Sequence, residues 1–349
     1  MATVAVVTSS PPLVEGGHLT IARELVRALG EAGHEAGLVV TPQNRFGRQA
    51  SAYLATWLTD VGETADGRAV DHVISLRYPS YAVRHDSHVC WLNHRMREYY
   101  DLWDRFSGTL SWRARVKEGA RRQVVHAVDR WLLTRNVDRV FAQSRTIQGR
   151  LERWGGLASD VLYPPAPVRD YRCDEYGDYL FVVSRLAPLK RIDLILQALA
   201  EPVAWGIRCV IAGEGGELAS LDQLRHKLGL EERVTFAGRL DEAGLVDHLA
   251  RCRAVVFAPY DEDYGFVTVE AFAAAKAVIT CRDSGGPAEV VEDETSGFVT
   301  DPNPPSLARA MRLVMDERLL AMRLGEAGHA RGQELSWTTT VDRLLGPRA

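Results

Sequence analysis

Short apolar segments that suit buried strands alternate with helical segments along nearly the whole chain. The first, residues 3–8, reads TVAVVT, and a loop containing Gly16-Gly17 leads from it into an amphipathic helix expected over 19–33. Uniformly apolar strands are typical of parallel sheets, because crossover helices cover both faces of such a sheet. The alternation therefore predicts a doubly wound α/β structure. Further strands of this first series are expected at 36–40, 71–76, 88–92 and 138–142.

Residues 161–167 read VLYPPAP and interrupt this alternation. Proline lacks the N–H that a helix interior or a central strand needs, so neither element continues through this segment. The alternation restarts afterwards, with strands expected at 179–183, 209–212, 234–236, 254–258 and 277–280. We predict two Rossmann-like domains, residues 1–168 and 175–335, that face each other across a cleft. Residues 336–349 are expected to pack back on the first domain.

Composition excludes several classes of protein. The net charge of the 349-residue chain is −4, which provides no general attraction for nucleic acid. The five cysteines are odd in number and never spaced as C-x-x-C, which argues against a disulfide framework and a zinc site. No signal peptide and no apolar run of 18 residues is seen, so we expect a cytoplasmic location.

The segment EDYGFVTVE places two carboxylates, Glu262 and Glu270, on either side of a strand-to-helix turn. The amino-terminal end of a helix offers unpaired N–H groups and a positive dipole. An anionic ligand is therefore expected near Gly265, Phe266 and Val267. The carboxylate of Glu270, on the first turns of that helix, can accept two hydroxyl hydrogen bonds and so bind a diol.

This segment resembles the Glu-x7-Glu motif of retaining glycosyltransferases with the GT-B fold (glycosyltransferase family 4, "glycosyl transferases group 1"). The loop SRLAPLKR, which begins at Ser184, is similar to the family's G-R-L-x-x-x-K loop, with serine in place of glycine. The resemblance implies that Arg185 and Lys190 bind the diphosphate of the donor. Arginine suits this role because its guanidinium can be bidentate, and lysine adds a mobile positive charge.

Other loops carry weaker similarity to the same family. The loop 211–215 and the loop 236–240 resemble those that line the nucleobase pocket, which implicates Gly213 and Leu240. Gly16 and Gly17 resemble a glycine loop that lets the backbone approach the donor phosphate. The loop at 284–289 resembles a further glycine-rich loop near the donor, although a turn with proline in the first helical turn explains it equally well. His94 lies where family members carry a histidine near the reacting sugar.

The resemblance implies a metal-independent, retaining hexosyltransferase. It implies transfer of a sugar from a nucleotide diphosphate sugar, with UDP favoured over GDP, to a hydroxyl acceptor in polysaccharide, glycoconjugate or natural-product synthesis. Glu262 and His94 are the implied catalytic residues, and Glu270 is the implied ligand of the donor ribose. The nucleotide sugar is a co-substrate, and no separate cofactor is expected.

Three alternatives stay open at this point. A sugar-nucleotide epimerase has the same two-domain architecture and needs no acceptor. A GT-A transferase is a second alternative, because Asp261-Glu262-Asp263 contains the Asp-x-Asp pattern of a metal–diphosphate site. A non-catalytic subunit that binds a nucleotide sugar is the third. The sugar, the base, the acceptor and the oligomeric state are not determined by the sequence.

A basic helix is expected within residues 111–139. This stretch carries eight cations against three acids, with Val116, Ala120, Val124, Val128 and Trp131 near one face. A solvated helix surface is the preferred interpretation. Weak contact with the inner face of an anionic membrane that bears a lipid-linked acceptor is the alternative.

Overall fold

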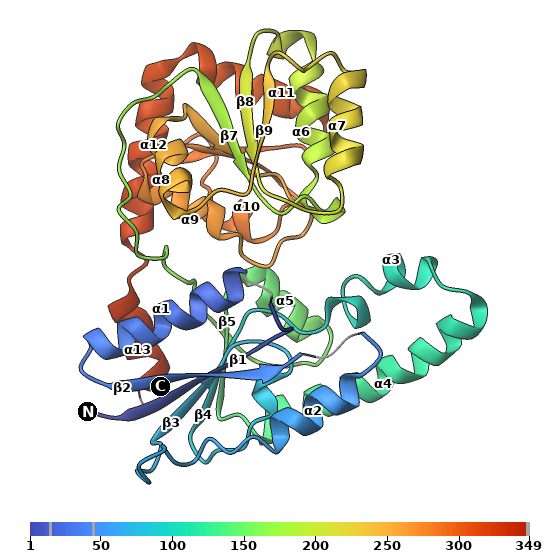
Figure 1. Ribbon diagram of the computed structural model, residues 1–349, viewed down its shortest axis with the longest axis vertical. Coiled ribbons are helices and arrows are strands. Elements are labelled where there is room, and N and C mark those ends of the chain that lie inside the picture. Colours follow the sequence, from blue (N-terminus) through green and yellow to red (C-terminus); the bar gives the residue numbers. More distant parts are fainter. Residues whose placement is uncertain (14–15, 44–45, 347–349) are drawn as a thin grey trace. The chain divides into compact units, whose positions relative to one another are not determined.

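The computed structural model describes residues 1–13, 16–43 and 46–346. They form two compact units, Met1–Pro164 with Ser336–Ala349, and Pro165–Leu335, which we call unit 1 and unit 2. Each unit contains one six-stranded parallel sheet with helices on its faces, so both have the doubly wound α/β structure predicted from the sequence (Figure 1). No helix in the described ranges is long and apolar enough to cross a membrane.

The sheet of unit 1 has the strand order β2-β1-β3-β4-β5-β6. Seven of the eight residues of β1 are buried, which confirms the interpretation of the first apolar run as a covered strand. The strands are β1 (Thr3–Ser10), β2 (Glu35–Pro42), β3 (His72–Ser75), β4 (His88–Leu92), β5 (Arg139–Ala142) and β6 (Asp160–Val161). The helices are α1 (Gly17–Glu31), α2 (Gln49–Trp57), η1 (Ser80–Ala82), η2 (Arg97–Tyr99), α3 (Trp103–Gly108), α4 (Trp112–Arg135), α5 (Arg145–Arg153) and α13 (Trp337–Leu345).

The last helix, α13, belongs to unit 1 although the whole of unit 2 precedes it in the chain. It contacts α1, and the Arg139 side chain donates from Nη2 to the carbonyl oxygen of Leu344 at 2.9 Å. The indole of Trp337 meets that of Trp91 edge to face, with ring centroids 6.1 Å apart. Unit 1 is therefore built from two separate stretches of sequence.

The sheet of unit 2 has the strand order β12-β11-β10-β7-β8-β9. The strand order reverses between β7 and β10, which are neighbours in the sheet, and ligands of doubly wound proteins bind at such a point. The strands are β7 (Tyr179–Val183), β8 (Arg208–Ala212), β9 (Val234–Gly238), β10 (Ala254–Val256), β11 (Val278–Cys281) and β12 (Gly297–Thr300). The helices are η3 (Pro188–Lys190), α6 (Ile192–Ala200), η4 (Pro202–Ala204), α7 (Leu218–Lys227), α8 (Glu242–Arg251), α9 (Phe266–Ala273), α10 (Gly286–Val290), α11 (Pro304–Asp316) and α12 (Arg318–Gln333).

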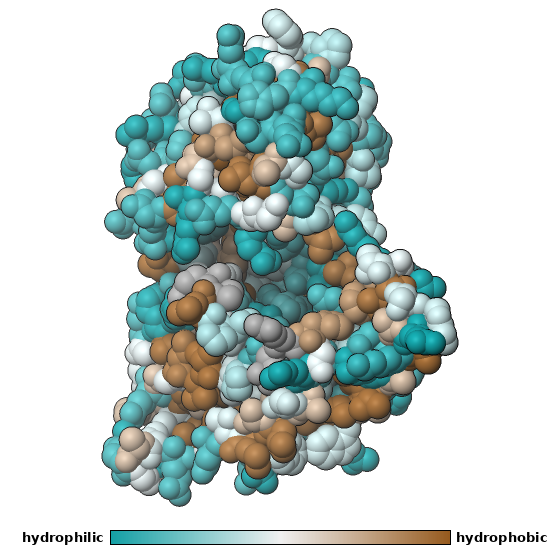
Figure 2. Space-filling view, turned by 45° about the vertical axis from the view of Figure 1, so that its right-hand side comes forward, coloured by the Kyte–Doolittle hydropathy of each residue, from teal (hydrophilic) through white to brown (hydrophobic). Residues whose placement is uncertain are grey.

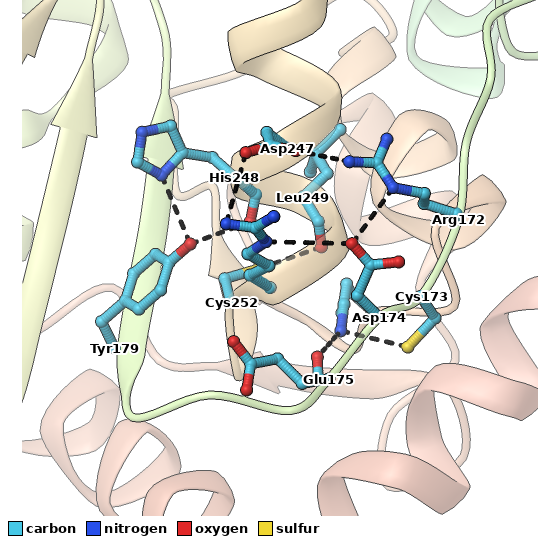
Figure 3. Close-up of polar contacts among 11 residues, drawn as sticks. Arg172, Cys173, Asp174, Glu175, Tyr179, Asp247, His248, Leu249 and Cys252 are labelled. Carbon is cyan, nitrogen blue, oxygen red and sulfur yellow. Dashed lines mark hydrogen bonds and ion pairs between the residues drawn. The ribbon is translucent and has the colours of Figure 1, made fainter.

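The segment 165–178, which connects the two sheets along the chain, is bound to unit 2 by polar side chains (Figure 3). Arg172 forms ion pairs with Asp174 and with Asp247 of α8. The buried ammonium of Lys276 donates to the Sγ of Cys173 at 3.1 Å and to the carbonyl oxygen of Glu175. This connection is therefore part of the folded structure of unit 2.

Helix α4 buries two carboxylates together with three apolar residues. Its buried residues are Glu118, Val125, Asp129, Leu132 and Leu133. The side that carries Val116, Ala120 and Val124 is exposed instead. The buried side of this helix therefore combines three apolar residues with two carboxylates that have partners in unit 1.

Asp129 is fully buried and accepts hydrogen bonds from three tyrosine hydroxyls. Tyr81 donates to Oδ1 at 2.5 Å, Tyr100 donates to Oδ2 at 2.7 Å, and Tyr53 donates to Oδ1. The guanidinium carbon of Arg95 lies 3.8 Å from the ring centroid of Tyr100. Burial raises the pKa of Asp129, while Arg95 and the three hydroxyls oppose this shift. The network joins α2, η1, the residue that follows η2, and α4.

Replacing Asp129 with alanine should destabilise unit 1 strongly, because three buried hydroxyls lose their acceptor. We expect a loss of about 3–5 kcal/mol in the free energy of unfolding, and a melting temperature lower by roughly 10 °C. Differential scanning calorimetry measures the change. Asp66→Ala, which removes an exposed carboxylate, is the control and should leave the melting temperature nearly unchanged. Equal effects of the two substitutions contradict this account.

Candidate functional site

Two loops of unit 2 meet at the point where the strand order reverses. The loop after β7 carries Lys190 and the loop after β10 carries Glu262. The Nζ of Lys190 donates to Oε2 of Glu262 at 2.6 Å, although the two residues are 72 positions apart. Both side chains are mostly buried. The fold therefore brings together the cation predicted for the diphosphate and the carboxylate predicted for the sugar.

Arg191 fixes the loop after β7 to the end of β10, and the sequence assigned it no role. Its guanidinium donates to both oxygens of Asp283 at 2.8 Å and to the carbonyl oxygens of Ala258 and Pro259. The backbone of Arg191 is left-handed, with φ of 49°. This turn separates η3 from α6 and leaves the preceding cations, Arg185 and Lys190, at the sheet edge.

Arg185 differs from Lys190 in its surroundings. Its side chain is exposed, and no described residue forms a hydrogen bond or an ion pair with its guanidinium. All five N–H donors of this group are thus available to a ligand. An exposed arginine at a strand end suits bidentate binding of a phosphate.

The glycine-rich loop at 284–286 supports the backbone of the motif loop. The N–H of Glu262 donates to the carbonyl oxygen of Ser284 at 2.9 Å, and the N–H of Gly286 donates to the carbonyl oxygen of Glu262 at 3.0 Å. Gly285 has φ of +69°, and a Cβ there would lie 2.4 Å from the carbonyl oxygen of Glu262. Only glycine permits this close approach of two backbones.

Helix α9 begins at Phe266, within the segment between Glu262 and Glu270 where a strand-to-helix turn was predicted. Gly265 is its N-cap with φ of +81°, and a Cβ there would lie 2.6 Å from the ring of Phe257. The first N–H groups of a helix have no partner within the helix. The amides of Phe266 and Val267 are therefore among the first N–H groups of α9, a few residues after Glu262. Their contact with a donor stays a prediction.

Glu270 lies one turn further along α9 and is buried. Its Oε1 accepts hydrogen bonds from Nη1 of Arg169 and from the hydroxyl of Tyr171 at 3.3 Å. Burial raises the pKa of Glu270, and the charge and hydrogen bond of Arg169 oppose that effect. Sequence reasoning missed both partners, because they come from the connecting segment about a hundred residues earlier and no local pattern marks them.

Gly213 and Leu240 lie in the neighbouring loops of unit 2. Gly213, with φ of +135°, donates from its N–H to the carbonyl oxygen of Gly238 at 2.7 Å. A Cβ at Gly213 would lie 1.8 Å from the carbonyl oxygen of Ser184, so this glycine supports the loop that carries Arg185. Leu240 is half-buried. Their assignment to a nucleobase pocket stays a prediction.

The other predicted residues, Gly16, Gly17 and His94, lie in unit 1. Gly16 caps α1 with an extended backbone, and Gly17 is the first residue of that helix. Residues 14 and 15 of the same loop lie outside the described residues. The extended conformation of Gly16 is open to any residue, so its backbone alone does not explain a glycine there.

His94 lines a small pocket at the carboxyl end of β4. The pocket is also lined by Arg95, Arg97, Arg150 and Asp101. The Nδ1 atom of His94 lies 2.7 Å from the carbonyl oxygen of Arg95, so Nδ1 carries the hydrogen and Nε2 holds the lone pair of the neutral ring. The geometry thus gives His94 a basic nitrogen in a cationic pocket.

Within the described parts of the chain, no group of three or more histidine, cysteine, aspartate or glutamate side chains is placed to hold a metal ion.

Residues 169–331 match the family described as Glycosyl transferases group 1. This range covers most of unit 2 and includes Arg185, Lys190, Glu262 and Glu270. The similarity to this family predicted from the sequence is therefore confirmed for the second unit.

Curated relatives are glycosyltransferases. A D-inositol 3-phosphate glycosyltransferase of Mycolicibacterium smegmatis is 33% identical over 168 residues, which are 47% of this chain and 38% of the relative. The enzyme of the same name from Kineococcus radiotolerans is 29% identical over 257 residues, 64% of this chain and 57% of the relative. An alpha-D-kanosaminyltransferase of Streptomyces kanamyceticus is 28% identical over 208 residues, 56% and 53% of the two chains. The chain thus spans 38% to 57% of the length of these relatives.

Solved structures resemble the chain along its whole length. Sucrose-phosphate synthase from Thermosynechococcus elongatus has a TM-score of 0.77 at 17% identity. The superposition covers 99% of this chain and 98% of the synthase. Anabaena HepE in complex with UDP and glucose has a TM-score of 0.71 at 19% identity, with 98% and 99% covered. Identities this low show the fold alone, and the fold is GT-B.

The backbone of the loop at Gly285 lies close to the backbone of Glu262, and a side chain at position 285 should disturb this contact. Gly285→Ala adds left-handed strain and a Cβ that collides with Glu262, so we expect a loss of about 2–4 kcal/mol in stability. Gly206→Ala is the matched control, because Gly206 also has positive φ, of +79°, but no atom lies within 4 Å of its Cβ position. It should cost only about 1–2 kcal/mol. Chemical denaturation of both variants measures the difference, and equal losses count against the role of this contact.

Proposed function

We propose that this protein is a retaining, metal-independent glycosyltransferase. It transfers a hexose from a nucleotide diphosphate sugar, a UDP-sugar first and a GDP-sugar second, to a hydroxyl acceptor. The observation that supports this most is the contact of Lys190 with Glu262 at the strand-order reversal of unit 2. A cation for the leaving diphosphate and a carboxylate for the sugar are thereby adjacent.

The leaving group gains stabilisation from the loop after β7. When the bond between the anomeric carbon and the diphosphate oxygen breaks, negative charge develops on that oxygen. Arg185 and Lys190 neutralise this charge, Lys190 by exchanging its carboxylate partner for a phosphate oxygen. The amides at the start of α9 provide further positive potential.

The anomeric carbon becomes positively charged in the transition state of retaining transfer. Glu262, once Lys190 has turned to the phosphates, stabilises this charge. The acceptor oxygen then forms the new bond on the face that the diphosphate leaves, and the hydroxyl proton passes to the departing phosphate oxygen. Most of the rate enhancement comes from placement and from fixed charges.

The donor nucleoside is held by Glu270, whose carboxylate accepts hydrogen bonds from the two ribose hydroxyls. The acceptor is assigned to unit 1, beside His94 and the pocket of arginines at the end of β4. The names of the curated relatives refer to an inositol phosphate and to a kanosaminyl group. The identity of the acceptor stays open in this proposal.

Glu262→Gln tests the proposed role of the charge. The substitution keeps the shape of the side chain and removes the negative charge, so kcat should fall by about 10²–10³ while donor binding changes little. Glu232→Gln, an exposed glutamate of the same unit, is the control. The rates are measured as nucleoside diphosphate release in the presence of an acceptor, with and without EDTA.

The product decides the reaction class. Proton NMR of the new glycoside should show the anomeric configuration of the donor. An inverted product, loss of activity in EDTA, or unchanged turnover of the Glu262→Gln enzyme contradicts the mechanism. An altered nucleotide sugar without any acceptor product indicates an epimerase instead.

We also propose that α4 gives unit 1 weak contact with an anionic membrane surface. Trp112, Val116, Val124 and Trp131 are 71%, 68%, 63% and 51% exposed. Both carboxylates of the helix, Glu118 and Asp129, are buried, so its solvent side presents apolar, cationic and a few neutral polar groups but no carboxylate. At about 100° per residue, this apolar stripe lies opposite the buried side. The space-filling view shows apolar side chains at the surface of unit 1 (Figure 2).

Vesicle flotation tests the membrane contact. The protein should bind vesicles that contain phosphatidylglycerol, bind pure phosphatidylcholine weakly, and dissociate at high salt. The variant Trp112→Ser with Val116→Ser and Val124→Ser should bind at least about tenfold more weakly. Trp205→Ser with Leu319→Ser removes equally exposed apolar groups from unit 2 and is the control. Equal binding of the two variants, or self-association in place of vesicle binding, overturns this assignment.

A further inference from the structure

Arg169 belongs to the segment that leads from β6 to β7, yet its side chain reaches into the candidate donor site. Its Nη1 donates to Oε1 of Glu270, and the same nitrogen lies 3.1 Å from the hydroxyl of Tyr171. On its other side, Nε lies 3.3 Å from Oε2 of Glu242, at the start of α8. The guanidinium is thus held between two carboxylates and a tyrosine.

Glu270 depends on this cation because it has little contact with water. Its residue is only 7% exposed, and an ionised carboxylate at such a depth needs an opposite charge or hydrogen bonds. Arg169 supplies the charge, and Tyr171 supplies a second hydrogen bond to the same oxygen. No other cation among the described residues pairs with Glu270.

The two oxygens of Glu270 have different surroundings. Arg169 and Tyr171 both bind Oε1, whereas no described residue donates a hydrogen bond to Oε2. The carboxylate is therefore anchored by one oxygen and presents the other to a ligand. This arrangement fits a group whose orientation is set before the ligand arrives.

We propose that Arg169 is a positioning residue of the donor site, which keeps Glu270 ionised and oriented to accept the ribose hydroxyls of the nucleotide. The inference rests on the proposed function of this site. It extends the donor site to the segment that connects the two sheets along the chain, so a residue that precedes β7 contributes to nucleotide binding.

Other titratable groups surround the same helix. Glu242 of α8 shares Arg169 with Glu270, and its charge opposes ionisation of Glu270. His329 of α12 contacts the carbonyl oxygen of Phe272 on α9, at 3.1 Å from Nδ1. Glu289 lies on α10, which also packs against α9. Arg169 is the cation that contacts the Glu270 carboxylate directly.

Removal of the cation should change how binding depends on pH. Burial raises the pKa of Glu270 and Arg169 opposes this, so Arg169→Met raises the pKa further. A protonated carboxyl accepts ribose hydroxyls poorly, so the loss of affinity begins at a higher pH in the variant. We expect a Kd for UDP that is at least about tenfold higher than that of the wild type at pH 6.5, and within about threefold at pH 9.

Calorimetric titration of UDP, or of GDP if the wild type prefers it, measures these constants from pH 6 to pH 9. The ratio of variant to wild-type Kd at each pH cancels the titration of the nucleotide phosphate. Arg169→Lys restores a positive charge and should recover the wild-type pH profile. Arg172→Met is the matched control, because Arg172 lies in the same segment but pairs with Asp174 and Asp247 (Figure 3).

The second substitution Glu270→Gln separates positioning from folding. In the Glu270→Gln background, Arg169→Met should no longer change the pH dependence, because the group that titrates is gone. A ratio of Kd values that is equally large at every pH overturns the inference and indicates a purely structural role. A wild-type protein that binds neither nucleotide instead contradicts the proposed function itself.

Discussion

Carboxylates that are buried beside a cation from a distant part of the chain determine the arrangement of unit 2 at its strand-order reversal. Glu262 pairs with Lys190 and Glu270 pairs with Arg169. Each pair joins loops that only the folded sheet brings together, and a buried charge without its partner is costly. The glycines of the supporting loops serve the same arrangement, because they let the backbones approach closely enough for the pairs to form.

Unit 1 satisfies its deepest carboxylate in a different way. Asp129 is surrounded by three tyrosine hydroxyls, which are neutral donors on rigid rings. Among the described residues no cation forms an ion pair with Asp129, and the nearby Arg95 lies against the ring of Tyr100. By contrast, Lys190 of unit 2 sits on a flexible stem and can change partners. The type of hydrogen-bond donor therefore distinguishes the structural carboxylate of Asp129 from the carboxylates that a ligand can use.

The strands and the break at 161–167 could be predicted because hydrophobic alternation and proline act locally. The short edge strands β6 and β12 were missed, since two to four residues give little pattern. Arg169 was missed for another reason: its contact with Glu270 spans 101 positions. On α4, Val116 and Val124 of the predicted apolar face are exposed and only Val128 packs against the core, because distant tyrosines make the side with Asp129 the buried one. Which site residues bind a ligand stays a prediction.

The return of α13 to unit 1 has a consequence for the order in which the units are completed. The ribosome releases the chain from the amino terminus, and domains generally fold as units during synthesis. Residues 165–335 have all emerged before 337–345, so unit 2 possesses its entire sequence while unit 1 still lacks its final helix. The unit that begins first is thus finished last. Until then, the surface of α1 that α13 covers is exposed to the cell and to its chaperones.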